Sequence, residues 1–331
     1  MITILKPGLL TTVQDSGRYG YQKYGVVAGG VMDQFAHVIA NILVGNEKNS
    51  PVLEITMVGP VIKFDQDTVI AICGADLSPA VNGKKIGNWR PVLIKKGSEL
   101  IFGNCQTGCR AYLAAAGGFK IPEVMDSKST YLRAGIGGFQ GRALKKGDKL
   151  FLEASSELSN HLMQSFLKKG SSDGFVMTHW RIYWETFYQK SSCIRVMKGR
   201  QYHLFKRRSQ EYFFRDLFTV TTASDRMGYR LQGPILELNG QKEMISEAVS
   251  FGTIQVPADG NPILLLADRQ TTGGYPKIGE VASVDLPTLA QVRPGDSLSF
   301  KEITCEDAQL LLIEREKRIE LLRKEILLKF S

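Results

Sequence analysis

The sequence has no run of about 18 uncharged apolar residues, which is the length a helix needs to cross a lipid bilayer. The opening segment, Met1–Gly8, does not resemble a secretory leader, because Pro7-Gly8 interrupts it before an apolar region develops. These two absences argue against membrane insertion and export. We therefore expect a cytoplasmic protein whose first residues form the first strand of the fold.

Cysteine and histidine are scarce, with five cysteines and four histidines among 331 residues. An odd number of cysteines in a protein expected in the cytoplasm favours reduced thiols over disulfides. Cys105 and Cys109 are four residues apart, but the Gln-Thr-Gly between them is typical of a turn and no histidine lies nearby in the sequence. We expect no metal site.

Several motifs of common catalytic and cofactor-binding classes are also missing. There is no Gly-x-x-x-x-Gly-Lys-Ser/Thr loop, which excludes ATP binding by that route. Gly135–Gly141 misses the dinucleotide-binding fingerprint by one residue, and neither His-Glu-x-x-His nor Gly-x-Ser-x-Gly occurs. Met197-Lys198 matches half of a biotin-carrying Ala-Met-Lys-Met turn, but its neighbours are Val196 and Gly199. We expect no covalent biotin on this chain.

The composition is that of a folded globular protein, with 43% apolar and 23% charged residues. The length suits roughly two domains of about 150 residues each. The net charge of +9 is distributed in lysine pairs along the chain. A nucleic-acid-binding surface would gather its basic residues. We interpret the pairs as solvated faces and expect neither a nucleic-acid nor a membrane partner.

Short apolar or alternating runs, separated by turn residues, fill residues 1–152 and return at 193–303. Their spacing of about 8–12 residues predicts a mainly β protein with two sandwich or barrel domains. The predicted strands of the first domain are Val52–Met57, Val69–Cys73, Pro91–Ile94, Leu100–Phe102 and Arg110–Ala115. Those of the second are Ile194–Met197, Phe218–Thr222, Gly252–Val256, Ile263–Leu266, Val281–Asp285 and Ser297–Phe300. Asn82-Gly83 predicts a tight hairpin.

Helical spacing is restricted to a few segments. The pattern predicts helices over Met32–Leu43 and Phe205–Asp216, and residues 304–331 predict a C-terminal amphipathic helix capped by Thr304. This last helix could pack on its own domain or bind a partner. Residues 153–192 are interpreted as a linker with a partly helical insert. Its aromatic residues, at helical spacing, are expected to cover a hydrophobic seam, with a membrane-surface role as the alternative: Trp180, Tyr183, Trp184, Phe187 and Tyr188.

Three short matches in the same order indicate an internal duplication. Arg18-Tyr19-Gly20-Tyr21 is matched by Arg226-Met227-Gly228-Tyr229, and Gly117–Ile121 by Gly273–Ile278. Each half then closes with Gly-Asp-x-Leu, at Gly147–Leu150 and Gly295–Leu298. We therefore expect two β domains of related plan.

The most polar strand end is Ala267–Ile278, which follows the apolar run Pro262–Leu266. It brings a carboxylate, a guanidinium, an amide and two hydroxyls into one loop, followed by Gly273-Gly274. Because the first half has a matching pair, Gly117-Gly118, we interpret the double glycine as part of the structural framework and not of the functional site. The functional hypothesis narrows to Asp268–Thr272, since the matching segment Leu113–Ala116 is apolar.

Three other polar clusters lie at predicted loops: Thr11–Arg18 leading into Ala28–Asp33, Ser127–Arg142, and Ser224–Arg230 with Ser246-Glu247. Arginines among small residues suit bidentate recognition of a carboxylate or phosphate. Neighbouring carboxylates could serve as acids or bases. The alternative for each residue is a structural ion pair or turn inside a β domain.

These same residues carry a family resemblance over essentially the whole chain outside 153–192 and the terminal helix. The markers include Leu10–Arg18, Met32-Asp33, Val44–Asn46, Ala115–Gly118, Ser127–Tyr131, Ser224–Leu231, Gly252–Val256 and the Ala267–Ile278 loop. The chain resembles the allophanate hydrolase subunit 2 family, which is biotin-dependent carboxyltransferase-like. One departure is Ala28–Met32, where members of that family usually carry Ser-Gly-Ala-Met.

The resemblance implies two tandem cyclophilin-like β-barrel domains, at 1–152 and 193–303, plus the C-terminal helix. Among family members it is closest to the 5-oxoprolinase component PxpC and to KipA. It implies a subunit, inactive alone, of an ATP-dependent hydrolase complex that opens the cyclic amide 5-oxo-L-proline to L-glutamate. The implied partners are a KipI-type (PxpB) subunit and a PxpA-type subunit, with ATP used by the complex. The alternatives are a KipA-like antagonist of a KipI-type histidine-kinase inhibitor, or a carboxyltransferase-type subunit of a urea or amide carboxylase.

Within that hypothesis, we assign the reacting centre to a seam between the barrels and a partner. The predicted catalytic residues are Asp268, Gln270, Thr272, Tyr275 and Asp15. The predicted substrate-binding residues are Arg18, Arg226, Arg230, Glu247, Ser129 and Thr130. Donors of this kind stabilise the charge that develops on an amide oxygen.

Overall fold

The computed structural model describes residues 1–170, 173–188, 192–240 and 244–330, which fall into two compact units. The first unit contains Met1–Arg18, Asp33–Trp184 and the chain from Arg318. The second contains Tyr19–Met32 and Glu185–Lys317. The segment Tyr19–Met32 therefore belongs to the second unit although the sequence places it within the first 152 residues.

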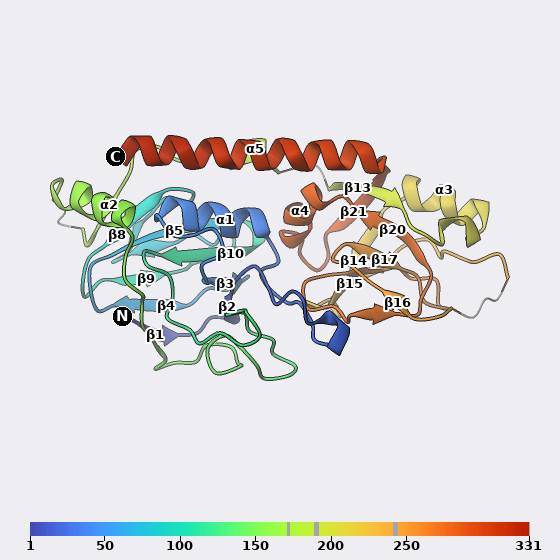
Figure 1. The fold of residues 1–331 in the computed structure, drawn as a ribbon, viewed down its shortest axis with the longest axis horizontal. Coiled ribbons are helices and arrows are strands. Elements are labelled where there is room, and N and C mark those ends of the chain that lie inside the picture. Colours follow the sequence, from blue (N-terminus) through green and yellow to red (C-terminus); the bar gives the residue numbers. More distant parts are fainter. Residues whose placement is uncertain (171–172, 189–191, 241–243, 331) are drawn as a thin grey trace. The chain divides into compact units, whose positions relative to one another are not determined.

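The first unit is built from two six-stranded antiparallel sheets (Figure 1). One sheet has the order β11-β1-β4-β9-β6-β7: Lys149–Leu150, Ile2–Lys6, Val61–Phe64, Glu99–Ile101, Ala80–Val81 and Lys84–Lys85. The other has the order β12-β8-β5-β10-β3-β2: Phe175–Met177, Pro91–Ile94, Thr68–Asp76, Thr107–Ala115, Val52–Thr56 and Leu10–Gln14. Alternating side chains from both sheets form one buried core that includes Ile4, Ile62, Ile72 and Leu113.

Local sequence signals explain the first unit's helix and hairpin. Helix α1 (Gln34–Leu43) begins where the Asp33 carboxylate accepts a hydrogen bond from the Ala36 N–H at 2.9 Å, an N-cap. It packs on β5 and β10 and buries most of its residues. Asn82 and Gly83 both have positive φ, 49° and 81°, as a two-residue hairpin turn requires, and they join β6 to β7. Both predictions are confirmed.

The second unit contains a closed seven-stranded barrel with the order β13-β20-β17-β18-β15-β14-β21. These strands are Cys193–Lys198, Lys277–Val281, Thr253–Gln255, Ile263–Leu265, Gly228–Gln232, Phe218–Val220 and Ser297–Glu302. Strands β13 and β21 pair in parallel, and the other neighbours are antiparallel. Helix α3 (Arg207–Arg215) packs on β21, with Phe213 stacked on Phe300 at 4.8 Å between ring centroids.

The predicted strand Val281–Asp285 is wrong beyond its first residue. Strand β20 ends at Val281, and a 3-10 helix, η4 (Ser283–Asp285), leads into the short helix α4 (Leu286–Ala290). Pro287 suits the first turn of a helix. The buried Asp285 carboxylate accepts hydrogen bonds from Arg195 Nε at 2.9 Å and Nη2 at 2.5 Å. Pairing with a distant strand thus overrides the apolar pattern of the segment.

The duplication inferred from the sequence has equivalent hydrogen bonds in the two units. Gly147 N donates to Ile4 O at 2.8 Å, and Gly295 N donates to Val220 O at 2.7 Å. In the same turns Asp148 accepts from Lys145 N at 2.7 Å, and Asp296 accepts from Arg293 N at 2.9 Å. The Gly-Asp-x-Leu segments are therefore the same turn, used once in each unit.

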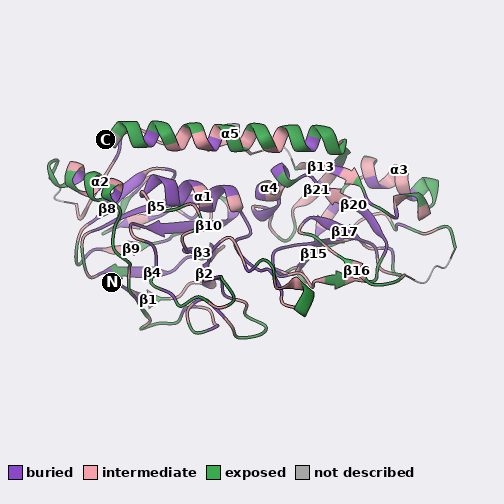
Figure 2. Ribbon diagram, viewed as in Figure 1, coloured by how far each residue is buried: buried purple, intermediate pink, exposed green. Residues whose placement is uncertain are grey.

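The chain ends in helix α5 (Cys305–Phe330), which begins where Thr304 Oγ1 accepts from Asp307 N at 3.1 Å. Figure 2 shows a largely exposed helix with isolated buried positions. Ile319 and Ile326 are 3% and 5% exposed. The C-terminal helix and its Thr304 cap are confirmed. No helix in the described part of the chain is long and apolar enough to span a bilayer.

Residues 153–188 are only partly helical. Helix α2 (Glu157–Leu167) is capped by Ser156, and β12 extends the second sheet of the first unit. The aromatic segment forms only a 3-10 turn, η2 (Trp184–Thr186), within its described residues. Trp184 stacks on Trp89 at 5.9 Å between ring centroids, while Tyr183 is 70% exposed. Packing on Trp89, and not helical spacing, determines which aromatic residues are covered.

The predicted architecture is confirmed: a mainly β chain with two β domains and a C-terminal helix. The described residues form five α-helices in total, α1 to α5.

Candidate functional site

The most buried ion pair among the predicted site residues joins Arg226 and Asp268 in the second unit. Arg226 Nε donates to Asp268 Oδ2 at 2.9 Å and Nη2 donates to Oδ1 at 3.0 Å, a bidentate pair. Both side chains are 7% exposed. The backbone connects the same two residues, because Asp268 N donates to Arg226 O at 2.9 Å. The carboxylate and guanidinium therefore neutralise one another beneath the surface.

The same arginine attaches the Tyr19–Met32 segment to the barrel. Arg226 Nη2 donates to Gly30 O at 2.5 Å. A Cβ at Gly29, whose φ is +63°, would lie 3.6 Å from Asp268 Oδ1. The Ala28–Met32 turn thus reaches the ion pair through a backbone carbonyl. The positive φ of Gly29 and Gly30, 63° and 89°, favours glycine at both positions.

The loop after Asp268 forms a short two-stranded sheet. Strand β19 (Thr272–Gly273) pairs with β16 (Glu247–Ala248), so the predicted residues Thr272 and Glu247 come from one small ladder. Glu247 accepts from Arg200 Nη1 at 3.1 Å and from Lys277 Nζ at 3.4 Å. Burial opposes ionisation, but Lys277, Arg200 and Gln201 together hold the pKa of Glu247 below its usual range. Glu247 is an ionised carboxylate held by basic neighbours.

Gly273 lies against a buried amide. A Cβ at Gly273 would lie 2.2 Å from Gln255 Nε2, and Gln255 is 1% exposed. That Nε2 has no hydrogen-bond partner among the described residues. A side chain at this glycine, which the sequence predicts to be part of the structural framework, would therefore force the Gln255 amide to move.

Two charged residues that are not among the named catalytic and substrate-binding predictions lie in or close to this loop. Glu280 accepts from Ser250 Oγ and Thr253 Oγ1, both at 2.9 Å. Arg269 packs over the Phe251 ring at 6.0 Å and donates to Val249 O at 3.4 Å. Burial lowers the pKa of Arg269, against the charges of Tyr19, Glu280 and Asp268. Arg269 was visible in the sequence as part of the polar segment Asp268–Thr272, whereas Glu280 lay in no predicted element or polar cluster.

We expect Glu280→Gln to change the pH dependence of stability. Burial raises the pKa of Glu280, although hydrogen bonds from Ser250 and Thr253 and the charges of Lys277 and Arg269 oppose the shift. A carboxyl that holds its proton more tightly when folded favours folding below its unfolded pKa, and this contribution is lost as pH rises through the folded pKa. The variant should therefore be more stable than the parent near neutral pH, and its advantage should shrink toward about pH 4.

Unfolding midpoints measured across this pH range test the expectation. Glu237→Gln is the matched control, because Lys206 holds the pKa of the exposed Glu237 below its usual value and the pH trend should be opposite. A Glu280→Gln advantage that is constant from acid to neutral pH would contradict the assignment.

In the first unit, Asp15 lies at the centre of a buried hydrogen-bond cluster. Its carboxylate accepts from Ser127 Oγ at 2.8 Å, Lys128 N at 2.6 Å, Gly17 N at 2.9 Å and Ser129 Oγ. Its own N–H donates to Ser129 Oγ at 3.0 Å. Asp15 is 8% exposed. Its position accounts for the Ser-Lys-Ser spacing, because each of the three residues sends a donor to one carboxylate.

Arg18 and Thr130 belong to the same cluster. Arg18, which is fully buried, donates from Nε to Val124 O and from Nη2 to Ser129 O, both at 2.9 Å. Thr130 Oγ1 donates to Val13 O at 2.9 Å. A Cβ at Gly138 would lie 1.8 Å from Thr130 Oγ1, so the loop Gly135–Gly141 packs directly on Thr130. Arg18 therefore binds backbone carbonyl oxygens of the segment 124–129 in this structure.

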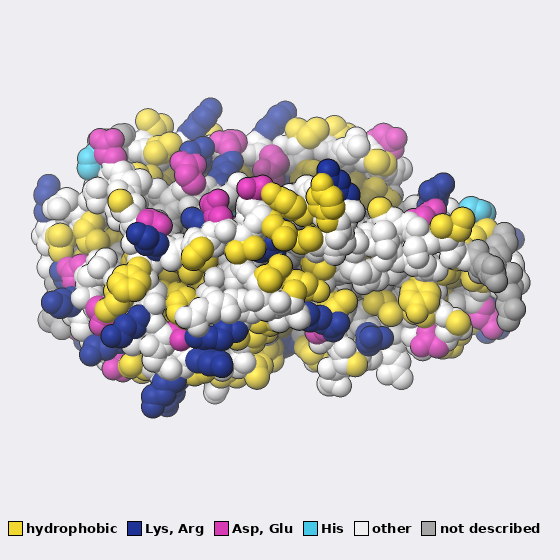
Figure 3. Space-filling model, turned by 60° about the horizontal axis from the view of Figure 1, so that its bottom comes forward, with side chains coloured by type: hydrophobic (Ala, Val, Ile, Leu, Met, Phe, Trp, Pro, Cys, Tyr) yellow, Lys and Arg dark blue, Asp and Glu magenta, His cyan; other side chains and the backbone are white. Residues whose placement is uncertain are grey.

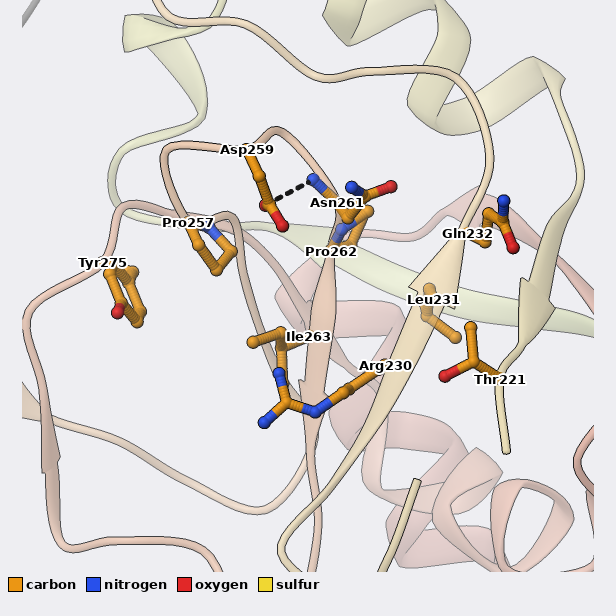
Figure 4. A pocket seen from close by; sticks show the side chains of 10 residues that line it. All are labelled: Thr221, Arg230, Leu231, Gln232, Pro257, Asp259, Asn261, Pro262, Ile263 and Tyr275. Carbon is orange, nitrogen blue, oxygen red and sulfur yellow. Dashed lines mark hydrogen bonds between the residues drawn. The ribbon is translucent and has the colours of Figure 1, made fainter. Parts of the chain in front are cut away.

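Two further predicted residues, Arg230 and Tyr275, line one pocket on the barrel of the second unit (Figure 4). The cavity has a volume of about 380 Å³. Its wall includes Asp259 and Asn261 from the turn between β17 and β18. The sequence reasoning missed both, although the run Asp259-Gly260-Asn261-Pro262 carries a turn signal. Gln270, by contrast, is half-buried in the loop and does not line this pocket.

The predicted residues are therefore gathered into local groups. In the second unit these are Arg226 with Asp268, Glu247 with Thr272, and Arg230 with Tyr275. In the first unit Asp15, Arg18, Ser129 and Thr130 form one cluster. Their catalytic and substrate-binding roles stay predictions.

Elsewhere, basic side chains are dispersed. In Figure 3, lysine and arginine side chains lie among acidic and hydrophobic ones on the visible face and do not form one continuous stripe. Within the described residues, no group of three or more His, Cys, Asp or Glu side chains is placed to hold a metal ion.

The fold is that of a protein of the carboxyltransferase type. The sequence model of the carboxyltransferase domain, subdomains A and B, matches residues 24–302, and the chain belongs to this family. The crystal structure of the Kluyveromyces lactis urea amidolyase superposes with a TM-score of 0.84 at 31% identity. That alignment covers 96% of this chain and 20% of the amidolyase.

Two bacterial relatives, both C subunits of 5-oxoprolinase, match over nearly their whole length. The Haemophilus influenzae protein is 37% identical over 324 residues, which cover 98% of each chain. The Escherichia coli protein is 38% identical over 308 residues, which cover 93% of each chain.

Proposed function

We propose that the chain is the C subunit of an ATP-dependent 5-oxoprolinase, which hydrolyses 5-oxo-L-proline to L-glutamate. The observation that carries the proposal is the end-to-end match to two 5-oxoprolinase C subunits. The Saccharomyces cerevisiae urea amidolyase is less similar in sequence, at 33% identity, so carboxyl transfer within a large carboxylase is the weaker candidate.

A subunit requires partners, and we propose a KipI-type (PxpB) and a PxpA-type protein. ATP would be bound by a partner, because this sequence has no phosphate-binding loop of the Gly-x-x-x-x-Gly-Lys-Ser/Thr type. We also propose that no biotin is attached, since Lys198 lies within strand β13 and pairs with Glu302 at 2.7 Å.

This chain's contribution would be to bind and polarise the lactam. Opening a cyclic amide places negative charge on the carbonyl oxygen, and fixed donors stabilise that charge without reorganisation. Side chains with surface available for such contacts are Arg230, Tyr275 and Thr272, which are exposed, whereas Arg226 is neutralised by Asp268. The buried pair would then position the loop that carries Thr272 and Tyr275.

The test is an ATP-dependent glutamate-release assay with purified proteins. We expect release from 5-oxo-L-proline only when this chain and both partners are present together. Release that is unchanged when this chain is omitted would contradict the proposal. Carboxylation of an amide in the presence of a biotin carboxylase, without glutamate release, would favour the carboxyltransferase alternative.

A further inference from the structure

The Arg230 pocket lies on the outward face of the barrel strand β15. Burial alternates along this strand, with Tyr229 and Leu231 inside and Arg230 and Gln232 exposed. The turn carrying Asp259 and Asn261 forms one wall, and Tyr275, which follows β19, forms another (Figure 4). At about 380 Å³, the cavity is within the size range of small-molecule sites.

Among the described residues, the guanidinium of Arg230 forms neither an ion pair nor a hydrogen bond, although its backbone N–H is satisfied by Ser224 Oγ at 3.0 Å. Arg226, four residues earlier, has both sides of its guanidinium bonded to Asp268 and Gly30. Arg230 is therefore the arginine of this motif that is available to an anionic ligand.

The other polar groups of the pocket are also available. Among the described residues, the side-chain amides of Asn261 and Gln232 and the Tyr275 hydroxyl form no hydrogen bonds. Asp259 accepts from the Asn261 N–H at 3.1 Å, which fixes the turn and leaves the amide free to contact a ligand. Ile263 supplies an apolar wall, and Figure 4 shows Arg230 extended alongside it.

We propose that this pocket binds a small carboxylate that also carries an amide. The carboxylate would take a bidentate contact from Arg230, the amide would meet Asn261 and Gln232, and the Tyr275 ring would cover the apolar part. The choice of 5-oxo-L-proline as the ligand rests on the proposed function, since it is a cyclic amide with a carboxylate. The pocket and the available polar groups in it do not depend on that choice.

The first experiment measures binding to the isolated full chain by ligand-observed NMR. The probes are 5-oxo-L-proline, N-acetylglycine as an unrelated amide acid, and 2-pyrrolidinone, which has the ring without the carboxylate. We expect both acids to bind and 2-pyrrolidinone to bind at least about tenfold more weakly. Arg230→Met should weaken both acids about tenfold or more, and Arg230→Lys should recover part of the loss because it restores charge without the planar fork.

Arg207→Met is the matched control, since Arg207 is in the same unit, on α3, with a side chain that is 92% exposed. It removes the same charge from the protein and should leave binding unchanged. Arg230→Met that binds the acids as tightly as the parent, or an isolated chain that binds neither acid, overturns the proposal.

The second experiment separates this inference from the proposed function. In the complex reconstituted with both partners, Arg230→Met should raise KM for 5-oxo-L-proline about tenfold or more, with a smaller change in kcat. If the parental complex shows no turnover while N-acetylglycine still binds in an Arg230-dependent way, the proposed function fails and the pocket stands. Turnover with an unchanged KM in Arg230→Met overturns the pocket and leaves the function intact.

Discussion

Asp268→Ala is expected to destabilise the second unit by about 3–5 kcal/mol. The substitution leaves the Arg226 guanidinium, now 7% exposed, buried without its carboxylate. Removing one partner of a buried ion pair is costly because the remaining charge has lost its water as well as its counterion. Native-state hydrogen exchange is the suitable measurement, since two units need not unfold in one transition. Amides of β15 and β18 and of the Tyr19–Met32 segment should exchange faster.

Two further variants identify the cause. Arg226→Met combined with Asp268→Leu removes both charges and should recover much of the lost protection, because an apolar pair can replace a buried ion pair at little cost. Glu237→Ala breaks the exposed pair with Lys206 and serves as the control that should leave exchange unchanged. An Asp268→Ala protein that exchanges like Glu237→Ala would show that the buried pair is not important for stability.

The same position allows the predicted catalytic role of Asp268 to be examined separately. Asp268→Asn keeps the shape of the side chain and one acceptor for Arg226, so it should destabilise the second unit less than Asp268→Ala does. A catalytic carboxylate predicts a loss of 5-oxo-L-proline turnover in the reconstituted complex that exceeds any loss of folded protein. Full turnover by a folded Asp268→Asn complex would exclude that role and leave Asp268 as a positioning residue.

Asp15→Ala is expected to release the loop of residues 122–142 in the first unit. The Asp15 carboxylate accepts four hydrogen bonds, from Ser127, Lys128, Ser129 and Gly17. Each buried donor left unsatisfied costs about 1–3 kcal/mol, so several together should cost at least about 3 kcal/mol. We expect faster hydrogen exchange and faster proteolytic cleavage within 122–142.

Glu123→Ala removes a carboxylate from the same loop and serves as the control. It forms a long ion pair with Lys128, 3.9 Å from Nζ to Oε1, and the Glu123 side chain is 63% exposed. This variant should behave like the parent, because an exposed pair contributes little. Equal cleavage rates in Asp15→Ala and Glu123→Ala would contradict the structural role of Asp15.

Much of the fold could be predicted because its signals are local. The Asn82-Gly83 turn, the Asp33 and Thr304 caps and the aspartate hydrogen bonds of the Gly-Asp-x-Leu turns each join residues within a few positions of one another. The segment Val281–Asp285 failed as a strand because its structure depends on Arg195, 90 residues away. The prediction that the Trp180–Tyr188 aromatic residues cover a seam at helical spacing was wrong for the same reason, since the distant Trp89 determines how Trp184 packs.

For the candidate site, the sequence by itself determined which segments are polar and where they leave the strands. It could not show whether each side chain is buried or exposed, or which residue it pairs with. Arg226 and Arg230 lie four residues apart in one motif, yet Arg226 is buried against Asp268, 42 residues away, and Arg230 points outward into a pocket. Burial and partner choice come from contacts between distant segments, which local patterns do not encode. Only the tertiary structure therefore decided which arginine is neutralised and which is available to a ligand.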